Sequence, residues 1–234
     1  NLVFDGVGPR TFTAPFTVKD QIYAYDGPYT LKTGNTATNT ALGINLYYGA
    51  TLKIRDDSVF HSNGNACHIG LDGYGALDID SGTLYIDNWL AVAQNSGSSA
   101  LMTITGGEIN ANRLNIGNRG SATINQSGGK VIGRQADDRH GIGEFDNTAN
   151  IVGKCYWNLS GGEFGAYGYL HIGTYGYGEV NQTGGREFCG NWESIGRYAG
   201  SEGRYNLSGG LLEVYGSSAG LIIGEAGKGT LNIS

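Results

Sequence analysis

Short stretches in which hydrophobic and polar residues alternate recur along this chain, and glycine closes them. In one stretch, Trp157 and Leu159 alternate with Asn158 and Ser160, and a Gly-Gly pair follows. Alternation with a period of two residues predicts a β-strand with one face toward a core and the other toward solvent. The glycines predict tight corners between consecutive strands.

That strand belongs to a phrase that repeats along the chain: an apolar residue, Asn, Leu or Gln, Ser or Thr, then Gly-Gly. Clear copies cover 124–129, 157–162, 180–185 and 205–210, looser copies cover 77–82 and 102–107, and 231–234 matches the opening of another. Consecutive Gly-Gly pairs are separated by 22, 33, 23 and 25 residues. Periods in this range predict a solenoid, in which each unit buries its apolar face by stacking on its neighbours.

One repeat, residues 155–178, predicts the fold. It contains three short segments, at 156–160, 163–166 and 169–172, which leave no room for a helix. We therefore predict an all-β fold, a right-handed parallel β-helix of about seven to eight coils stacked about 4.8 Å apart. The repeats occupy 49–234, and residues 1–48 are expected to form an N-terminal entry segment with the first irregular coils. A β-propeller is the main alternative, but its blades need about 40 residues.

Stacking places equivalent side chains of successive coils above one another, so columns can be assigned from the repeat. The two core columns are Leu77, Met102, Ile124, Trp157, Val180, Tyr205 and Leu231, and Ile79, Ile104, Leu159, Leu207 and Ile233. A third column, in which each amide is expected to bond to the next as a structural ladder, is Asn125, Asn158, Asn181, Asn206 and Asn232. Gln126 and Gln182 interrupt the second core column, so each needs a hydrogen-bond partner if its side chain points inward.

Composition narrows the classes of protein and partner. Hydrophobic residues make up 39% of the chain, with 15 Tyr and 7 Phe, which is enough for a core and argues against disorder. The 42 Gly occur with only 3 Pro, so neither collagen nor a Pro-rich linker fits. The net charge is −6, so nucleic acid is not expected as a partner, because phosphate binding needs clustered Lys and Arg. Polyanionic polysaccharides are expected to be repelled unless cations intervene.

Two further features of the chain concern membrane spans and the two termini. No apolar run approaches the ~20 residues needed to span a bilayer, so no membrane span is predicted. The chain opens on Asn1 rather than Met and stops inside a copy of the repeat, which is typical of a mature product or of a piece of a longer chain.

The three cysteines are Cys67, Cys155 and Cys189. Cys155 begins one strand of its repeat and Cys189 lies in a different strand of the next, so stacking should not align them. We therefore expect buried thiols rather than a disulfide.

The repeat resembles those of bacterial surface proteins. The phrase Tyr205-Asn206-Leu207-Ser208-Gly209-Gly210, followed by Leu221-Ile222-Ile223-Gly224, is similar to the glycine-rich β-strand repeats of autotransporter-type passengers and of exported proteins with a C-terminal sorting signal. The opening Leu2-Val3-Phe4-Asp5-Gly6 with Arg10-Thr11-Phe12 is similar to the entry region of such passengers. The resemblance covers 49–234 clearly and 1–48 loosely. It implies a pectin-lyase-like β-helical rod that is exported to the cell surface or matrix, and it carries over no catalytic residues.

An insertion at 134–147 makes the 33-residue step and contains Asp137, Asp138 and His140. Insertions in a solenoid become loops on one face, and such loops often carry binding. These three side chains could ligate a divalent cation or act as acid and base on a sugar. The alternative is a solvated polar loop, with His140 as an ordinary strand residue.

Aromatic side chains near the glycine corners are candidates for stacking on sugar rings, or else they cover apolar surface with the hydroxyl in water. The candidates are Tyr167, Tyr169, Tyr175, Tyr177, Trp89 and Trp192.

A second acidic group surrounds Arg55, which is expected to lie near Asp80 one coil later and to pair with it. A Ca²⁺ site made of Asp56, Asp78 and Asp80 is the alternative, although the chain lacks the repeated Gly-Gly-x-Gly-x-Asp phrase. No other cofactor, catalytic residue or metal site is predicted, because no Gly-x-Ser-x-Gly, zinc-type spacing or phosphate-binding loop occurs.

Two functional hypotheses follow. The first is a noncatalytic extracellular or cell-surface rod that serves as spacer, adhesin or filament subunit and stacks on other copies of itself through exposed strand edges. The second is a carbohydrate-binding module, or a polysaccharide lyase or glycoside hydrolase. It would bind an extracellular polysaccharide with the 134–147 loop, Tyr167 and Tyr169. The residues favour the first hypothesis, so an enzyme is not expected.

Overall fold

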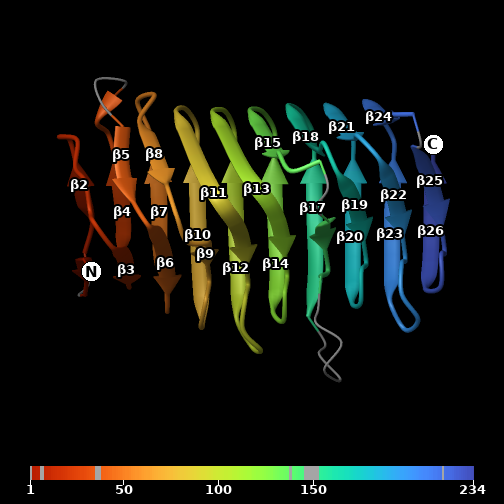
Figure 1. Ribbon diagram of the computed structural model, residues 1–234, viewed down its shortest axis with the longest axis horizontal. Helices are drawn as coiled ribbons and strands as arrows, with labels where there is room; N and C mark the ends of the chain where they lie inside the picture. The colour runs from red at the N-terminus through yellow and green to blue at the C-terminus, as the bar shows by residue number, and fades with distance from the viewer. Residues whose placement is uncertain (1, 6–7, 35–37, 137–138, 145–152, 218) are drawn as a thin grey trace.

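The computed structural model describes residues 2–5, 8–34, 38–136, 139–144, 153–217 and 219–234. Their regular elements are β-strands, which stack along the long axis as a parallel β-solenoid of about nine turns (Figure 1). No helix among these residues is long and apolar enough to cross a membrane. The structure confirms the predicted all-β solenoid, and the predicted number of coils, seven to eight, was slightly low.

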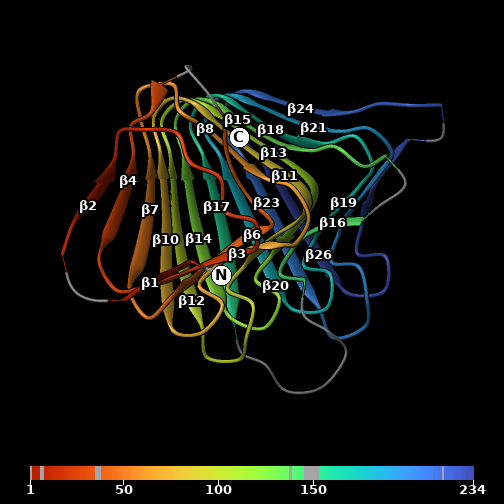
Figure 2. The same ribbon diagram turned by 60° about the vertical axis from the view of Figure 1, so that its left-hand side comes forward.

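The strands of successive turns fall into three series, which form the walls of the solenoid. The first series is a ten-stranded sheet and contains the repeated Asn phrase. Its strands are β2 (Arg10–Phe12), β4 (Pro28–Leu31), β7 (Ala50–Ile54), β10 (Tyr74–Ile79), β12 (Ser99–Ile104), β14 (Ser121–Gln126), β17 (Lys154–Leu159), β20 (Tyr177–Gln182), β23 (Glu202–Leu207) and β26 (Lys228–Ile233). In Figure 2 this wall runs from β2 on the left to β26 on the right, with β18, β21 and β24 along the top and β16 and β19 on the right.

The second and third series belong to one larger sheet, because β11 (Thr83–Val92) and β13 (Glu108–Ile116) are long enough to run through both. The other strands of the second series are β5 (Thr38–Ala41), β8 (Val59–Ser62), β15 (Lys130–Gly133), β18 (Glu163–Ala166), β21 (Arg186–Cys189) and β24 (Leu211–Val214). Those of the third series are β1 (Leu2–Phe4), β3 (Gln21–Tyr25), β6 (Gly43–Tyr47), β9 (Cys67–Ile69), β16 (Arg139–Ile142), β19 (Tyr169–Ile172), β22 (Trp192–Ile195) and β25 (Gly220–Ile223).

The N-terminal segment continues the same stack. Strand β1 pairs with β3 and β3 with β6, while β2 pairs with β4 and β4 with β7, all in parallel. The side chains of Ile22, Ala24, Tyr29 and Leu31 are buried in the same core as the later repeats. Residues 1–48 lack the Gly-Gly phrase, yet their described strands stack as the later ones do.

The core lies inside the solenoid and consists of columns that run along its axis. Ile124 pairs in register with Trp157, and Trp157 with Val180, as the repeat predicts. The Trp157 side chain is fully buried, and its ring stacks on Phe164 of β18 with centroids 3.7 Å apart. Large aromatic rings therefore join the first and second walls across the interior.

The two glutamines that interrupt the core column point inward and are fully bonded to neighbouring groups. Trp157 Nε1 donates to Gln126 Oε1 at 3.2 Å, and Gln126 Nε2 donates to the Glu163 carbonyl at 2.9 Å. Gln182 repeats this arrangement, because the Tyr205 hydroxyl donates to Oε1 and Nε2 donates to the Leu211 carbonyl at 3.1 Å. Each buried glutamine is thus matched by an aromatic donor one turn further along.

The asparagine side chains of the repeated phrase form a continuous hydrogen-bonded ladder on the outside of the first series. Each Nδ2 donates to the Oδ1 of the preceding Asn, at 2.9, 3.1, 2.8 and 2.7 Å along the column. The members are Asn125, Asn158, Asn181, Asn206 and Asn232. The ladder joins five successive turns, including the two on either side of the insertion.

The three cysteines are free and buried, as expected. Burial raises the pKa of the Cys155 and Cys189 thiols to about 12, and that of Cys67 rises as well for the same reason. These thiols are core residues and remain protonated at neutral pH.

Candidate functional site

The structure describes only part of the insertion at 134–147 that the sequence suggested as a binding loop. Asp137 and Asp138 lie outside the described residues. The side chain of His140 is 0% exposed inside the solenoid, which favours the alternative that it is an ordinary strand residue. Its Nδ1 accepts the Leu114 backbone N–H at 3.1 Å, and Nε2 bonds the Gln135 carbonyl at 3.1 Å. His140 takes the position of Leu170 in the next turn, so it is a core residue with satisfied nitrogens.

Tyr167 and Tyr169 point to different surroundings. Tyr167 is 50% exposed at the corner after β18, and its ring lies 5.6 Å from Phe188. Tyr169 lies on the third series, where its ring contacts His171 and Trp192. Tyr169 therefore belongs to the surface of the third series, whereas Tyr167 lies beside Phe188, over whose ring the Arg186 guanidinium is placed.

The acidic group around Arg55 is an ion-pair cluster. Arg55 Nε lies 2.9 Å from Asp80 Oδ2, as expected, and Nη2 bonds the Asp78 carboxylate. The guanidinium thus occupies the position between the two carboxylates that a Ca²⁺ ion would need. Among the described residues, no group of three or more His, Cys, Asp or Glu side chains is arranged to hold a metal ion.

The outer side of the third series carries one large side chain per turn, which we call the lateral row. Its members are Trp89, Arg113, Arg139, Tyr169 and Trp192. The Arg113 guanidinium lies 4.8 Å from the Trp89 ring centroid, and the Tyr169 and Trp192 rings meet edge to face at 6.4 Å. Trp89 is 41% and Trp192 is 46% exposed, so aromatic surface is presented at both ends of the row.

A buried carboxylate lies beside the lateral row. Arg113 Nη2 donates to Glu144 Oε1 at 2.8 Å, and the Thr174 hydroxyl donates to Oε2 at 3.0 Å. A Cβ on Gly141 would lie 1.9 Å from Oε2, so the missing side chain leaves room for the carboxylate against β16. Burial raises the pKa of Glu144, although the Arg113 charge and the Thr174 hydrogen bond oppose the shift.

His171 lies one turn further along the same face and is uncharged. Burial, together with the nearby charges of Arg197 and Arg139, lowers its pKa to about 3. Arg197 Nη1 contacts His171 Nε2. Since a guanidinium only donates, Nε2 must be the acceptor and Nδ1 must carry the proton. Nδ1 has no hydrogen-bond partner among the described residues.

The polar contacts beside the lateral row, which we call the lateral network, continue through Arg197 to the next turn. Arg197 Nε lies 3.7 Å from Glu225 Oε2, and the Ser194 hydroxyl donates to that oxygen at 2.9 Å. Glu144 is clamped by Arg113, and His171 Nε2 is occupied by Arg197. These groups therefore hold successive turns together and are not poised to move a proton on a substrate.

Stacked tyrosines flank the network. The Tyr175 and Tyr198 rings are nearly parallel with centroids 4.3 Å apart, and Arg139 Nη1 donates to the Tyr198 hydroxyl at 3.1 Å. Tyr25 and Tyr47 form a similar pair at 4.8 Å near the N-terminal end. The faces of these rings are occupied by each other, which supports the interpretation that the tyrosines cover apolar surface rather than stack on sugar rings.

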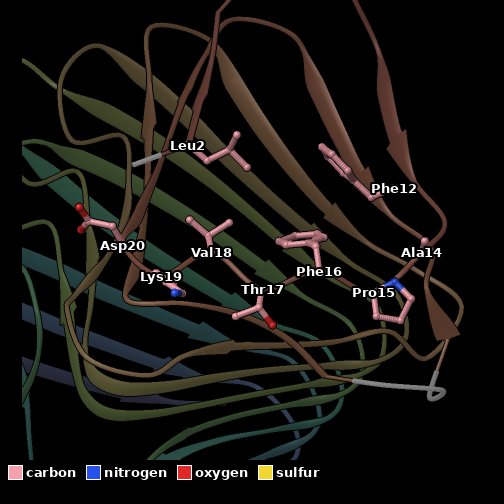
Figure 3. A pocket seen from close by; sticks show the side chains of 9 residues that line it. All are labelled: Leu2, Phe12, Ala14, Pro15, Phe16, Thr17, Val18, Lys19 and Asp20. Atoms are coloured by element: carbon pink, nitrogen blue, oxygen red, sulfur yellow. The ribbon is translucent and has the colours of Figure 1, made fainter.

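A mainly apolar cavity lies at the first turn. It has a volume of about 610 Å³, and its lining includes Phe12, Phe16 and Val18 (Figure 3). Phe12 and Phe16 also pack against the hydrophobic core, so the cavity is an opening of the core at this end of the stack.

The sequence analysis did not identify the charged residues of the lateral network. Arg113, Glu144 and Arg197 occupy positions at which the repeat keeps no residue type. Counting back three residues from each Val or Ile that ends a third segment finds every member of the lateral row, from Trp89 to Trp192. This fixed spacing could have identified the lateral row from the sequence. Comparisons with known proteins add no assignment, since no protein family, curated protein or solved structure matches the chain.

Proposed function

We propose that this chain is a noncatalytic rod of an exported extracellular or cell-surface protein, in which it serves as a spacer, adhesin or filament subunit. The observation that carries the proposal is the asparagine ladder, whose amide-to-amide distances stay between 2.7 and 3.1 Å over five turns. The same contact is thus repeated along these five turns, which suits a molecule whose role depends on its length. With a strand spacing of about 4.8 Å, about nine turns give a rod of ~43 Å.

Removal of one complete turn tests the rod. Val180 and Tyr205 are in register, so deletion of residues 180–204 joins Glu179 to Tyr205 and keeps the columns aligned. We expect a folded β-protein that is shorter by ~4.8 Å, because turns contact only their neighbours. Small-angle X-ray scattering measures the length, and circular dichroism checks the fold. A variant that unfolds, or that keeps the original length, contradicts the proposal.

Carbohydrate binding on the lateral row is a second candidate function. Its support is the exposure of Trp89 and Trp192 in one row with Tyr169, next to arginine and carboxylate groups that can bond hydroxyls. Rings that offer apolar surface beside polar groups suit the mixed surface of a sugar chain.

A glycan array with the intact protein tests this candidate. We expect binding that falls at least about tenfold in the variant Trp89→Ala/Trp192→Ala, which corresponds to the loss of about 1.4 kcal/mol. Tyr74→Ala is the matched control, because Tyr74 is also 41% exposed but lies on the first series. Equal losses in both variants, or no binding by the parent, contradict the candidate. The same polysaccharides are assayed for cleavage, which a binding module does not show.

A further inference from the structure

Two glutamates lie inside the core of one turn. Glu187 on β21 and Glu193 on β22 are both 0% exposed, and none of their four carboxyl oxygens has a hydrogen-bond partner among the described residues. Buried polar groups without partners are rare, and an unpaired buried carboxylate is strongly unfavourable. This pair is unlike the two core glutamines, whose polar atoms are bonded.

The register shows that both glutamates replace apolar residues of core columns. Glu187 lies between Phe164 and Leu212. Glu193 lies between Leu170 and Leu221. Phe164 and Leu170 are fully buried, whereas Leu212 is half-buried and Leu221 is 37% exposed. The pair is thus bordered by apolar side chains of both neighbouring turns.

The surroundings contain little that could neutralise two charges. The titratable groups that face the pair are the Tyr205 phenol of β23 and the Cys189 thiol of β21. The Tyr205 hydroxyl is bonded to Gln182 of β20, and the Cys189 thiol donates to the Gly168 carbonyl at 3.3 Å. Strands β18, β19, β24 and β25 contribute the four apolar side chains of the two columns.

One cation acts on the pair from outside. The Arg186 charge opposes the rise in the pKa of Glu187, but its guanidinium bonds Glu163 and Glu213 at 2.7 Å each on the outer surface. Protonation is therefore the means by which the pair is accommodated in the closed core.

We propose that the seam between the turn of β21, β22 and β23 and the turn of β24, β25 and β26 is a proton-controlled joint, closed when Glu187 and Glu193 are neutral and opened when they ionise. Separation at this seam brings both carboxyl groups to water, while all earlier turns stay stacked. Local opening of this kind needs less free energy than unfolding of the whole solenoid. The inference goes beyond the proposed rod, since it adds a place at which the rod responds to pH.

The direction of the response follows from the pKa shifts. Burial raises the pKa of Glu193 from its ordinary 4.5 to about 8, and that of Glu187 also rises through burial and the charge of Glu193. The closed seam therefore binds protons that the open seam releases at neutral pH. Its stabilisation is complete below about pH 4.5 and is lost as the pH rises toward about 8.

Hydrogen exchange measured by mass spectrometry tests the joint, with exchange times scaled for the intrinsic effect of pH. Between about pH 5 and pH 8, we expect the opening equilibrium of β24, β25 and β26 to rise by up to about tenfold per pH unit for each proton released. Protection of β12 and β14 should not change. Equal loss of protection in all turns, or no change in the last turn, overturns the proposal.

Variants can distinguish the effect of ionisation of Glu187 and Glu193 from the effect of their size and shape. Glu187→Gln/Glu193→Gln keeps the shape and is expected to abolish the pH dependence at the seam, while Glu108→Gln on the outer side of β13 leaves it intact. The same dependence in both variants overturns the proposal. If the double variant does not fold, infrared spectroscopy of the parent decides, because the closed joint requires protonated carboxyl groups at about pH 6. Their absence at that pH contradicts the joint.

Discussion

Gly162→Ala is expected to destabilise the solenoid by about 2–5 kcal/mol, more than an alanine at any open glycine corner. Gly162 has a φ of 80°, a region in which L-residues are strained by about 1–2 kcal/mol. A Cβ there would also lie 2.4 Å from the Gly129 carbonyl oxygen of the preceding turn. Backbone cannot move aside as a flexible side chain does, so the two turns must separate locally. Urea unfolding followed by circular dichroism measures the change.

Gly97→Ala is the matched control for the close contact between turns. Gly97 has a φ of 79°, nearly that of Gly162, but no atom lies within 4 Å of the position that a Cβ would take there. It should therefore lose only the conformational part, about 1–2 kcal/mol. Equal losses in the two variants would show that the backbone conformation, and not the contact between turns, requires glycine at the Gly-Gly corner.

Trp157→Ala is expected to cost about 3–5 kcal/mol, the usual range for an aromatic side chain removed from a packed core. The indole is 0% exposed and stacks on Phe164, so its removal leaves a cavity between the first and second walls. Gln126 Oε1 also loses the Trp157 Nε1 donor, and a buried acceptor without a partner costs about 1–3 kcal/mol. Thermal and urea unfolding, followed by circular dichroism, measure the loss.

Two further variants apportion the effect of Trp157. Trp157→Phe keeps a ring in the column but removes the donor, so it should lose less than Trp157→Ala. Gln126→Leu restores the apolar column and removes the acceptor, so the pair Trp157→Phe/Gln126→Leu should be more stable than Trp157→Phe alone. If the double variant is less stable than the single one, the hydrogen bond is not the reason that Gln126 occupies the column.

Much of the fold could be predicted because the repeat is visible in the sequence. The period of the Gly-Gly pairs and the alternation in segments such as 156–160 were enough for a parallel solenoid and for the registers of the core columns. The pairing of Arg55 with Asp80 followed from the same register. The register of the first turns was less accessible, because the described strands before residue 48 lack the glycine phrase.

The candidate site was harder to predict than the fold. The insertion drew attention to His140 because it lies among charged residues, yet the alternation of β16 turns its ring into the core. The lateral network joins Arg113 to Glu144, and His171 to Arg197, across turns at positions where the repeat has no preferred residue. No pattern within a single turn distinguishes such pairs from independent surface charges.

The sequence by itself determined the strands, the corners and the stacking register, since these depend on local alternation and on glycine at fixed positions. Only the tertiary structure decided which polar side chains became partners and which stayed alone. Gln126 meets Trp157 because their turns adjoin, whereas Glu187 and Glu193 meet apolar columns from both sides. The physical reason is that these buried contacts and hydrogen bonds join residues of two different turns. The sequence of a single repeat shows only one of the two partners.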